Sequence, residues 1–300
     1  MTYLTEPMQY EFFRHGVIVA TLVGALCGLM GVYVVLRRMS YIGHGLSHSV
    51  FGGAVVAYLI SLNFYIGAGL WGFLSAILIN ATARRRNIGA DAAIGIITTA
   101  SFALGVALIS KTRSFTRNFE AALFGNILGV TPQDIAVIAV VAAVVLAGVL
   151  VFYRQLLFTT FDPEIARIYG VPTHWVDTGF ALALAATIVA SMNIVGVTLI
   201  AAAIVIPPST ARLLTNSFGA MLLLSTAIGA GCGFAGMFLS YWYDVASGAA
   251  VVLLAAGVFA TVYAATTFRR ALLTSRHLVS ATSPFPAPMR NRALAHEDHP

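Results

Sequence analysis

Two histidines inside an apolar stretch are the strongest chemical signal in this sequence. His44 and His48 stand four residues apart in the segment Gly-His-Gly-Leu-Ser-His, so both side chains fall on one face of a helix. Neutral imidazole is the commonest protein ligand for transition metals, and polar rings within a membrane are costly unless they face a cavity or a partner. A helix that begins near Ser40 would carry His48 about 12 Å along its axis. We predict that both histidines handle a metal ion, and that Ser47 lies beside them in the path which that ion follows. The alternatives are that both rings hydrogen-bond to neighbouring helices, or that His44 merely sits at the membrane interface.

A pair of prolines marks a second unusual point. Pro207 and Pro208 interrupt an apolar run, and each proline removes a backbone donor and frees a carbonyl one turn earlier. Ser209 and Thr210 follow and offer hydroxyls to the freed groups. The pair predicts a kink or an unwound segment, which a membrane tolerates only where the backbone faces protein or water. A break that lines a transport path and a simple packing kink both remain open.

A short polar segment, residues 161–177, carries the signals of a helix start. Asp162 is a good N-cap, Pro163 suits the first helical position and Glu164 stands beside it. Gly170 then favours termination of this short helix. The segment predicts a short helix with a role at the membrane surface, and the alternative is a surface connector.

The composition shows which solvent these residues face. Of the 300 residues, 59% are hydrophobic and 9% are charged, whereas soluble domains carry about 25% charged residues. The mean hydropathy is +0.88. A soluble protein and a disordered chain are both excluded, because neither is this apolar. We predict an all-α bundle of membrane-spanning helices.

Stretches without formal charge map the expected spans, since a spanning helix needs roughly 20 apolar residues. They lie between Arg14 and Arg37, Arg38 and Arg84, Asp91 and Lys111, Asp134 and Arg154, Asp177 and Arg212, Arg212 and Asp244, and Asp244 and Arg269. Two are long enough for paired helices, with breaks expected near Asn63 and Asn193. The prediction is nine spans, or eight if one paired run is re-entrant. Residues 1–13 are expected to form a short N-terminal segment, 14–270 the membrane-spanning domain and 271–300 a disordered tail, while 118–130 is expected to be interfacial or re-entrant.

Other residues in these runs have simpler explanations. Asp91, Asp177 and Asp244 stand at expected span ends, where helix capping accounts for them. Glycines spaced four apart, beginning at Gly24 and at Gly229, let helix backbones approach closely. We expect these residues to serve packing rather than transport chemistry.

The basic residues orient the bundle. Placing alternate loops and the C-terminal tail on one side gives that side 13 of the 17 Lys and Arg residues. The positive-inside rule makes this side cytoplasmic, so the N-terminus is expected outside and the C-terminus inside the plasma membrane. The net charge of +6 is therefore a topology signal and does not point to nucleic acid.

Six segments together resemble one known family. They are VVLRRMSYIGHGLSHSV (34–50), DAAIGII (91–97), FGNILG (124–129), FDPEIARIYGV (161–171), VGVTLIAAAIVIPPSTARLL (195–214) and DVASGAA (244–250). Their order and sequence are similar to the ABC-3 family, the membrane permeases of bacterial manganese and zinc ABC importers. The resemblance covers residues 10–268 and implies the fold of a type II ABC importer permease.

The resemblance also implies which residues contact the cargo. In this family an Asp and a His, four residues apart, are implicated in metal passage, and they fall on His44 and His48. The histidine matches, whereas the aspartate is replaced by His44. Because imidazole is a softer ligand than carboxylate, this change should favour Zn²⁺ over Mn²⁺. Pro208 stands where the family often has alanine, and Pro207 belongs to the same expected path.

Partners follow from the same resemblance. Such permeases form a dimer, bind two cytoplasmic ATPase subunits and receive metal from an extracytoplasmic binding protein. The helix near 162–170 would be the coupling helix that docks into the ATPase. Its expected contact residues are Asp162, Pro163, Glu164, Arg167 and Gly170. The metal would be transported cargo, with no permanently bound cofactor.

The sequence leaves three rival functions to consider against this one. One is a permease for a siderophore or corrinoid, which the missing carboxylate allows but the six segments disfavour. Another is a gradient-driven secondary transporter, which internal inverted repeats would favour. The last is an intramembrane enzyme. The sequence contains no P-loop, no His-Glu-x-x-His and no Gly-x-Ser-x-Gly motif, so we expect no enzyme activity in this chain, and energy must come from another chain or an ion gradient.

Overall fold

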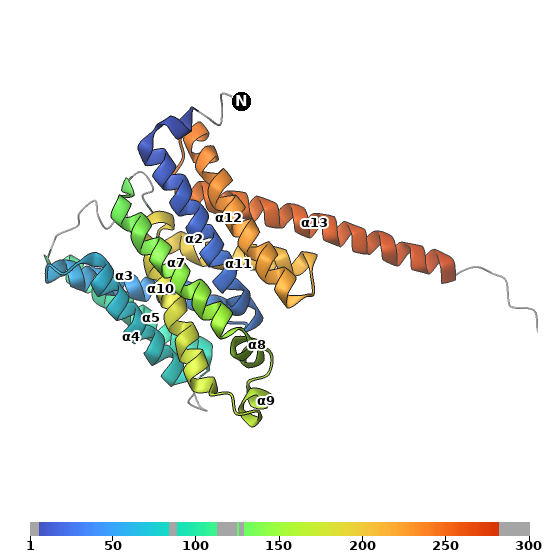
Figure 1. The fold of residues 1–300 in the computed structure, drawn as a ribbon, viewed down its shortest axis with the longest axis horizontal. Coiled ribbons are helices and arrows are strands. Elements are labelled where there is room, and N and C mark those ends of the chain that lie inside the picture. Colours follow the sequence, from blue (N-terminus) through green and yellow to red (C-terminus); the bar gives the residue numbers. More distant parts are fainter. Residues whose placement is uncertain (1–5, 84–88, 113–124, 126–128, 282–300) are drawn as a thin grey trace, which may run out of the picture.

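The computed structural model describes residues 6–83, 89–112, 125 and 129–281, and every regular element within these ranges is a helix (Figure 1). The all-α prediction is therefore confirmed for the described part of the chain. In order, the helices are η1 (Pro7–Gln9), α2 (Glu11–Leu36), α3 (Ser40–Leu59), α4 (Phe64–Ala83), α5 (Ala90–Thr112), α7 (Pro132–Val151), α8 (Tyr153–Phe161), α9 (Pro163–Ile168), α10 (Thr173–Val195), α11 (Val197–Leu214), α12 (Phe218–Tyr243) and α13 (Ser247–Ala281).

The expected count of eight or nine membrane spans is not confirmed. In the described ranges, seven helices are long and apolar enough to cross a membrane, namely α2, α4, α5, α7, α10, α12 and α13. Each charge-free stretch nevertheless forms the one or two helices expected of it. Helix α3 differs because it carries two histidines and several serines, and α11 differs because its apolar part, Leu199–Leu214, is short.

Helix α2 is the central element, and it packs closely against α12. A Cβ added to Gly24 would overlap the carbonyl oxygen of Gly229, and a Cβ on Gly28 would overlap that of Ser225. The Ser225 hydroxyl donates a hydrogen bond of 2.6 Å to the carbonyl of Gly28. The predicted small-residue pairs thus form an interface in which two backbones touch, as is common between helices in lipid.

The break between α10 and α11 falls at Gly196, three residues after Asn193, where the sequence predicts a break. Gly196 has φ +84° and ψ 151°, a conformation that side-chain-bearing residues rarely adopt. The chain therefore turns at the residue that tolerates the turn, and both helices remain regular on either side.

Helix α11 continues through both prolines, so the backbone is not unwound there. Pro207 and Pro208 are buried, and the carbonyl of Ile204 that Pro208 leaves without its helical donor lies against Gly31 of α2. Ser209 and Thr210 donate to the carbonyls of Val205 and Ile206 at 2.7 and 2.9 Å, not to the freed carbonyls. The packing explanation of this proline pair therefore fits the structure better than the path-lining break.

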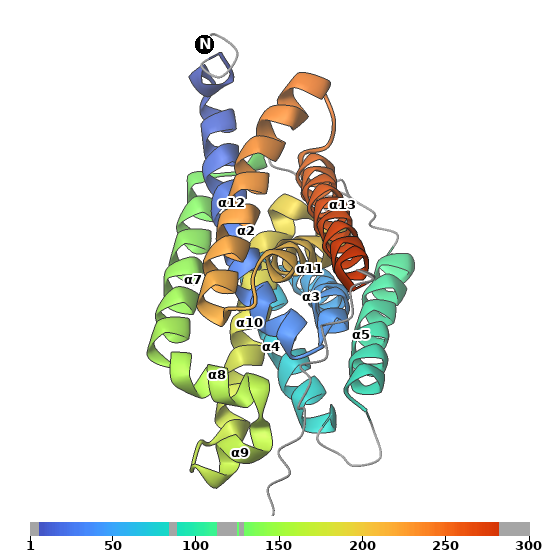
Figure 2. The same ribbon diagram turned by 90° about the vertical axis from the view of Figure 1, so that its right-hand side faces the viewer.

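The two ends of the bundle hold different elements. The N-terminus lies at one end, and α8 and α9 lie at the other (Figure 2). Helix α9 is the short helix that the sequence predicts, because the carboxylate of Asp162 accepts the backbone N–H groups of Glu164 and Ile165 at 3.1 and 2.9 Å. Gly170, with φ +76°, follows its end. The structure therefore confirms the short helix, its cap at Asp162 and its termination before Gly170.

Two further expectations concern the C-terminal tail and the segment 118–130. Helix α13 extends to Ala281, so residues 271–281 are helical although we expected the tail to begin at 271; residues 282–300 lie outside the described residues. The expected interfacial segment 118–130 also falls almost entirely outside the described residues.

The α2–α12 contact yields a first prediction. Gly24→Ala should lower the free energy of unfolding by about 1–3 kcal/mol, because the new methyl group meets backbone that cannot rotate away. Melting of the purified chain in detergent measures this. Gly148→Ala in α7 is the matched control, since a Cβ there has no neighbour within 4 Å. Equal melting temperatures for the two variants would contradict the account of this interface.

Candidate functional site

The two histidines lie side by side on α3, as their spacing predicts. The helix begins at Ser40, and the ring centroids of His44 and His48 are 4.5 Å apart with an interplanar angle of 83°. His44 is exposed, whereas His48 is half-buried. A ligand that enters from the surface would therefore meet His44 first and His48 second.

Both rings line a cavity of about 340 Å³ between α3 and α5. Its lining residues are Tyr41, His44, Gly45 and His48 from α3, and Ile94, Gly95, Thr98, Thr99 and Phe102 from α5. The lining runs from exposed residues such as Tyr41 and Thr99 to buried ones such as Ile94 and Thr98. The cavity is thus a pocket that opens on the surface of the chain and leads inward past the histidines.

His48 is not held in the way a structural core histidine would be. Its ring packs edge-on against Phe102, with centroids 4.9 Å apart, and its buried Nδ1 atom has no hydrogen-bond partner in the described part of the chain. An unpaired buried nitrogen costs free energy unless another group compensates it. The alternative in which both rings hydrogen-bond to neighbouring helices is therefore unsupported at this atom, and the ring stays available as a ligand.

Glycines on α3 bring α5 close enough to form the cavity wall. A Cβ on Gly45, between the two histidines, would lie 2.6 Å from Ile94 Cγ2, and a Cβ on Gly52 would overlap the carbonyl oxygen of Ser101. The distance between the histidine face of α3 and the α5 wall is therefore set by the side chain of Ile94 at Gly45 and by the backbone of Ser101 at Gly52.

The other residues expected in the path lie elsewhere. Ser47 is buried and donates a hydrogen bond of 2.7 Å to the carbonyl of His44, so it serves its own helix. Pro207 and Pro208 are absent from the cavity lining, and Pro208 lies against Gly31 of α2. The structure brings His44 and His48 together in the cavity, whereas Ser47, Pro207 and Pro208 are not among its lining residues.

The ligand set of a single chain is small. Among the described residues, no group of three or more His, Cys, Asp or Glu side chains could hold a metal ion. Closed structural metal sites use four ligands. Two imidazoles in an open cavity suit an ion that binds briefly and leaves, which is what a transport path requires.

The α9 end presents a separate apolar surface that sequence inspection missed. Ile168 and Tyr169 are 82% and 80% exposed, whereas Ala166 is fully buried. Of the residues expected there, Glu164 is exposed, and Arg167 donates from Nε to the Thr173 hydroxyl at 3.2 Å. Large apolar residues just before a helix-ending glycine in a polar loop were the signal that could have identified this surface.

A buried arginine is the second feature that the sequence did not reveal. Asp177, expected as a helix cap, accepts a hydrogen bond from Arg37 Nη1 at 2.9 Å instead. Burial lowers the pKa of the Arg37 guanidinium, and the charge and hydrogen bond of Asp177 oppose that change. Asp244 does end α12, in the left-handed conformation with φ 51°.

Comparison with known proteins agrees with this architecture. The model of the ABC 3 transport family matches residues 9–266. The manganese transport system membrane protein MntC of Halalkalibacterium halodurans is 37% identical over 261 residues, which cover 87% of this chain and 89% of the relative. The manganese import system permease protein ScaB of Streptococcus gordonii is 36% identical over 251 residues, covering 84% and 90%. The solved structure of PsaBC from Streptococcus pneumoniae in complex with Fab aligns with a TM-score of 0.79 and 34% identity, over 87% of this chain and 94% of that one.

The open histidine pair predicts measurable metal binding. Zn²⁺ at a hundredfold excess over Kd should stabilise the purified chain by about 2.7 kcal/mol, seen as a higher melting temperature. His48→Ala should abolish that increase, because one imidazole of the pair is lost. His174→Ala removes an exposed histidine outside the cavity and should keep the increase. The same response in both variants would show that the ion binds elsewhere.

Proposed function

The chain belongs to the ABC 3 transport family, and we propose that it is the membrane permease of an ATP-driven importer for zinc or manganese. Partner subunits hydrolyse ATP, and this chain forms the path through the plasma membrane. The observation that carries the proposal is the pair His44 and His48, facing a cavity that opens on the surface of a chain of this family. The metal is cargo that passes these imidazoles and is not retained.

A second copy of the chain completes the path. One chain offers two imidazoles, whereas zinc sites in proteins commonly hold four ligands. The rim of the cavity is exposed at Tyr41, His44 and Thr99, and helix α5 is largely unburied, so this face is open to a partner. A homodimer with its cavities facing each other would gather four imidazoles around the passing ion.

The choice of metal depends on His44. The relatives named above carry out manganese transport, and the resemblance places an aspartate of the family at this position. Imidazole in place of carboxylate removes a negative charge and provides a softer ligand, which favours zinc over manganese. We therefore expect this permease to accept zinc more readily than a permease that keeps the carboxylate.

The α9 end is the docking surface for the ATPase. Helix α9 is short, capped by Asp162 and joined to α10 through Arg167 and Thr173. It presents Ile168 and Tyr169 outward, and aromatic and aliphatic anchors of this kind dominate protein interfaces. Asp162, Pro163 and Gly170 shape the helix, while the exposed apolar pair makes the contact.

The orientation follows from charge. Arg37, Arg154 and Arg167 belong to the end that holds α8 and α9, and the N-terminus lies at the opposite end (Figure 2). The positive-inside rule places the α9 end in the cytoplasm, where the ATPase is. The extracytoplasmic metal-binding protein then delivers its ion at the end that holds the N-terminus.

Replacing one ligand tests the cargo. His44→Asp should raise the ratio of Mn²⁺ to Zn²⁺ uptake several-fold, because it restores a hard carboxylate, while His48→Ala should lower uptake of both ions. Competition uptake by cells that express the complete importer measures both effects. An unchanged ratio in His44→Asp would refute the ligand argument, and full uptake by His48→Ala would refute the path.

Replacing the exposed apolar pair tests the docking surface. Ile168→Ser combined with Tyr169→Ser should weaken ATPase binding by about tenfold or more, because buried anchors of this kind carry most of an interface's binding energy. Co-purification of the ATPase with tagged permease measures this. Tyr243→Ser is the control, since Tyr243 is 72% exposed at the end of α12, away from α9. Undiminished ATPase recovery by the double variant would contradict the assignment.

A further inference from the structure

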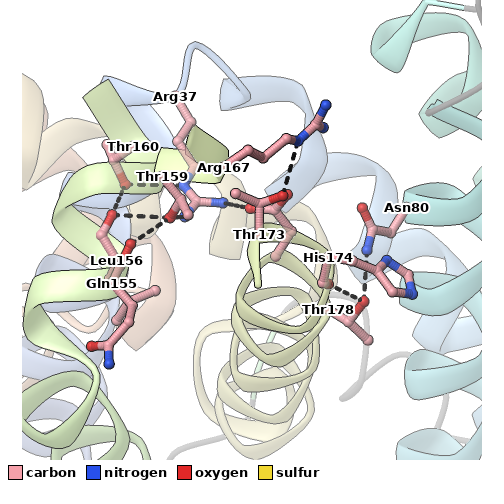
Figure 3. Close-up of polar contacts among 11 residues, drawn as sticks. Arg37, Asn80, Gln155, Leu156, Thr159, Thr160, Arg167, Thr173, His174 and Thr178 are labelled. Atoms are coloured by element: carbon pink, nitrogen blue, oxygen red, sulfur yellow. Dashed lines mark hydrogen bonds and ion pairs between the residues drawn. The ribbon is translucent and has the colours of Figure 1, made fainter. Parts of the chain in front are cut away.

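Arg37 stands where the last turn of α2 ends, and its guanidinium is almost fully enclosed. The side chain is 9% exposed, and its charge is compensated by four groups at once. Nη1 donates to Asp177 at 2.9 Å, Nη2 to the Thr159 hydroxyl at 2.9 Å and Nε to the Thr160 hydroxyl at 3.1 Å. The guanidinium carbon also lies 4.5 Å from the centroid of the Phe180 ring. Figure 3 shows the arginine reaching between two helices.

The two threonines are arranged to accept from a cation. The Thr159 hydroxyl donates its proton within α8, to the carbonyls of Gln155 and Leu156 at 2.9 and 3.2 Å, and Thr160 donates to Leu156 at 2.6 Å (Figure 3). A hydroxyl has one proton, so each oxygen is left with lone pairs that point to a donor. The site therefore suits a side chain that only donates. Arginine reaches the three acceptors from three separate nitrogens in one plane, whereas all three donors of an ammonium group are on a single nitrogen.

These contacts join the coupling segment to the transport core at both of its ends. Thr160 stands two residues before Asp162, the cap of α9, so Arg37 holds the entrance to α9. At the exit, Arg167 donates to Thr173, one helical turn before Asp177 on α10. A displacement of α9 would therefore move the hydrogen-bond partners of Arg37 on both α8 and α10.

On its other side, Arg37 adjoins the helix that carries the histidines. The chain turns at Arg38, which has φ +56°, and α3 starts at Ser40. The backbone N–H of Arg37 donates to Tyr33, and that of Met39 donates to Val34, so this corner is a closed turn and not a loose linker. Arg37 is thus the point at which the end of α2, the start of α3 and the α8–α9 unit meet.

We propose that Arg37 is a positioning residue that transmits displacement of the coupling helix α9 to the α2–α3 corner, and so to His44 and His48. The inference rests on the proposed function, because it assigns a role to the contact with the ATPase. Asp177, Thr159 and Thr160 are the partners through which Arg37 contacts α10 and α8. Charge-assisted hydrogen bonds are stronger and more specific in geometry than neutral ones, so the several made by Arg37 tie these elements to one another.

The test uses the complete importer in proteoliposomes, with Zn²⁺ and Mn²⁺ import and ATP hydrolysis measured in the same vesicles. Arg37→Lys keeps the charge but loses the fork, and it should lower the number of ions imported per ATP by roughly threefold or more. Arg38→Lys is the matched control, because Arg38 is exposed and adjacent, and it should keep the wild-type ratio. A structural role alone would lower the amount of assembled complex but leave the ratio of ions to ATP unchanged.

A second variant removes the contacts to α8 alone. Thr159→Val combined with Thr160→Val keeps Arg37 paired with Asp177 and should lower the ratio in the same direction, whether or not Arg37→Lys assembles. A wild-type ratio in this variant, or in an assembled Arg37→Lys, would overturn the inference while leaving the proposed function standing. Failure of the wild-type complex to import either ion would instead overturn the proposed function, and the inference with it.

Discussion

Close backbone contact between helices is the constraint on which this structure depends. Lipid offers helices no hydrophobic reason to associate, so tight packing at small residues takes that role. Gly24 and Gly28 bring α12 onto α2, and Gly45 and Gly52 bring α5 onto α3. The second contact forms the wall opposite the histidines, and the first fixes α2, whose end carries Arg37. Both the histidine-lined cavity and the position of the Arg37 link to α8 and α10 therefore depend on glycines that allow the helices to approach.

Most polar side chains in the bundle are hydrogen-bonded within the chain, and the paired groups fall into two kinds. Ser47, Thr98 and most other buried hydroxyls donate to carbonyls of their own helix, which satisfies them without a partner. Arg37 is satisfied by partners from two other helices, which makes it a link between elements. His48 belongs to neither kind, since its buried Nδ1, like the buried Tyr33 hydroxyl, has no hydrogen-bond partner among the described residues. An ion in passage is the partner that such an atom can accept and release.

The sequence was a good guide to features decided locally. Charge-free length predicted each helical stretch, the cap at Asp162 predicted α9, and the spacing of the histidines predicted their common face. Features decided by distant contacts were out of reach. The partner of Asp177 is 140 positions away, and the part of α11 that continues through Pro207 and Pro208 packs against Gly31 of α2, which is distant in the sequence. The exposure of Ile168 and Tyr169 likewise follows from the way α9 sits on the bundle.

The central claim is that both histidines touch the transported ion, and X-ray absorption at the zinc edge tests it most directly. Zn²⁺ bound to the purified permease should show imidazole nitrogen ligands at about 2.0–2.1 Å, and the imidazole signal should fall when His48 is replaced by alanine. A spectrum that contains only oxygen ligands, or one that the replacement leaves unchanged, would contradict the account.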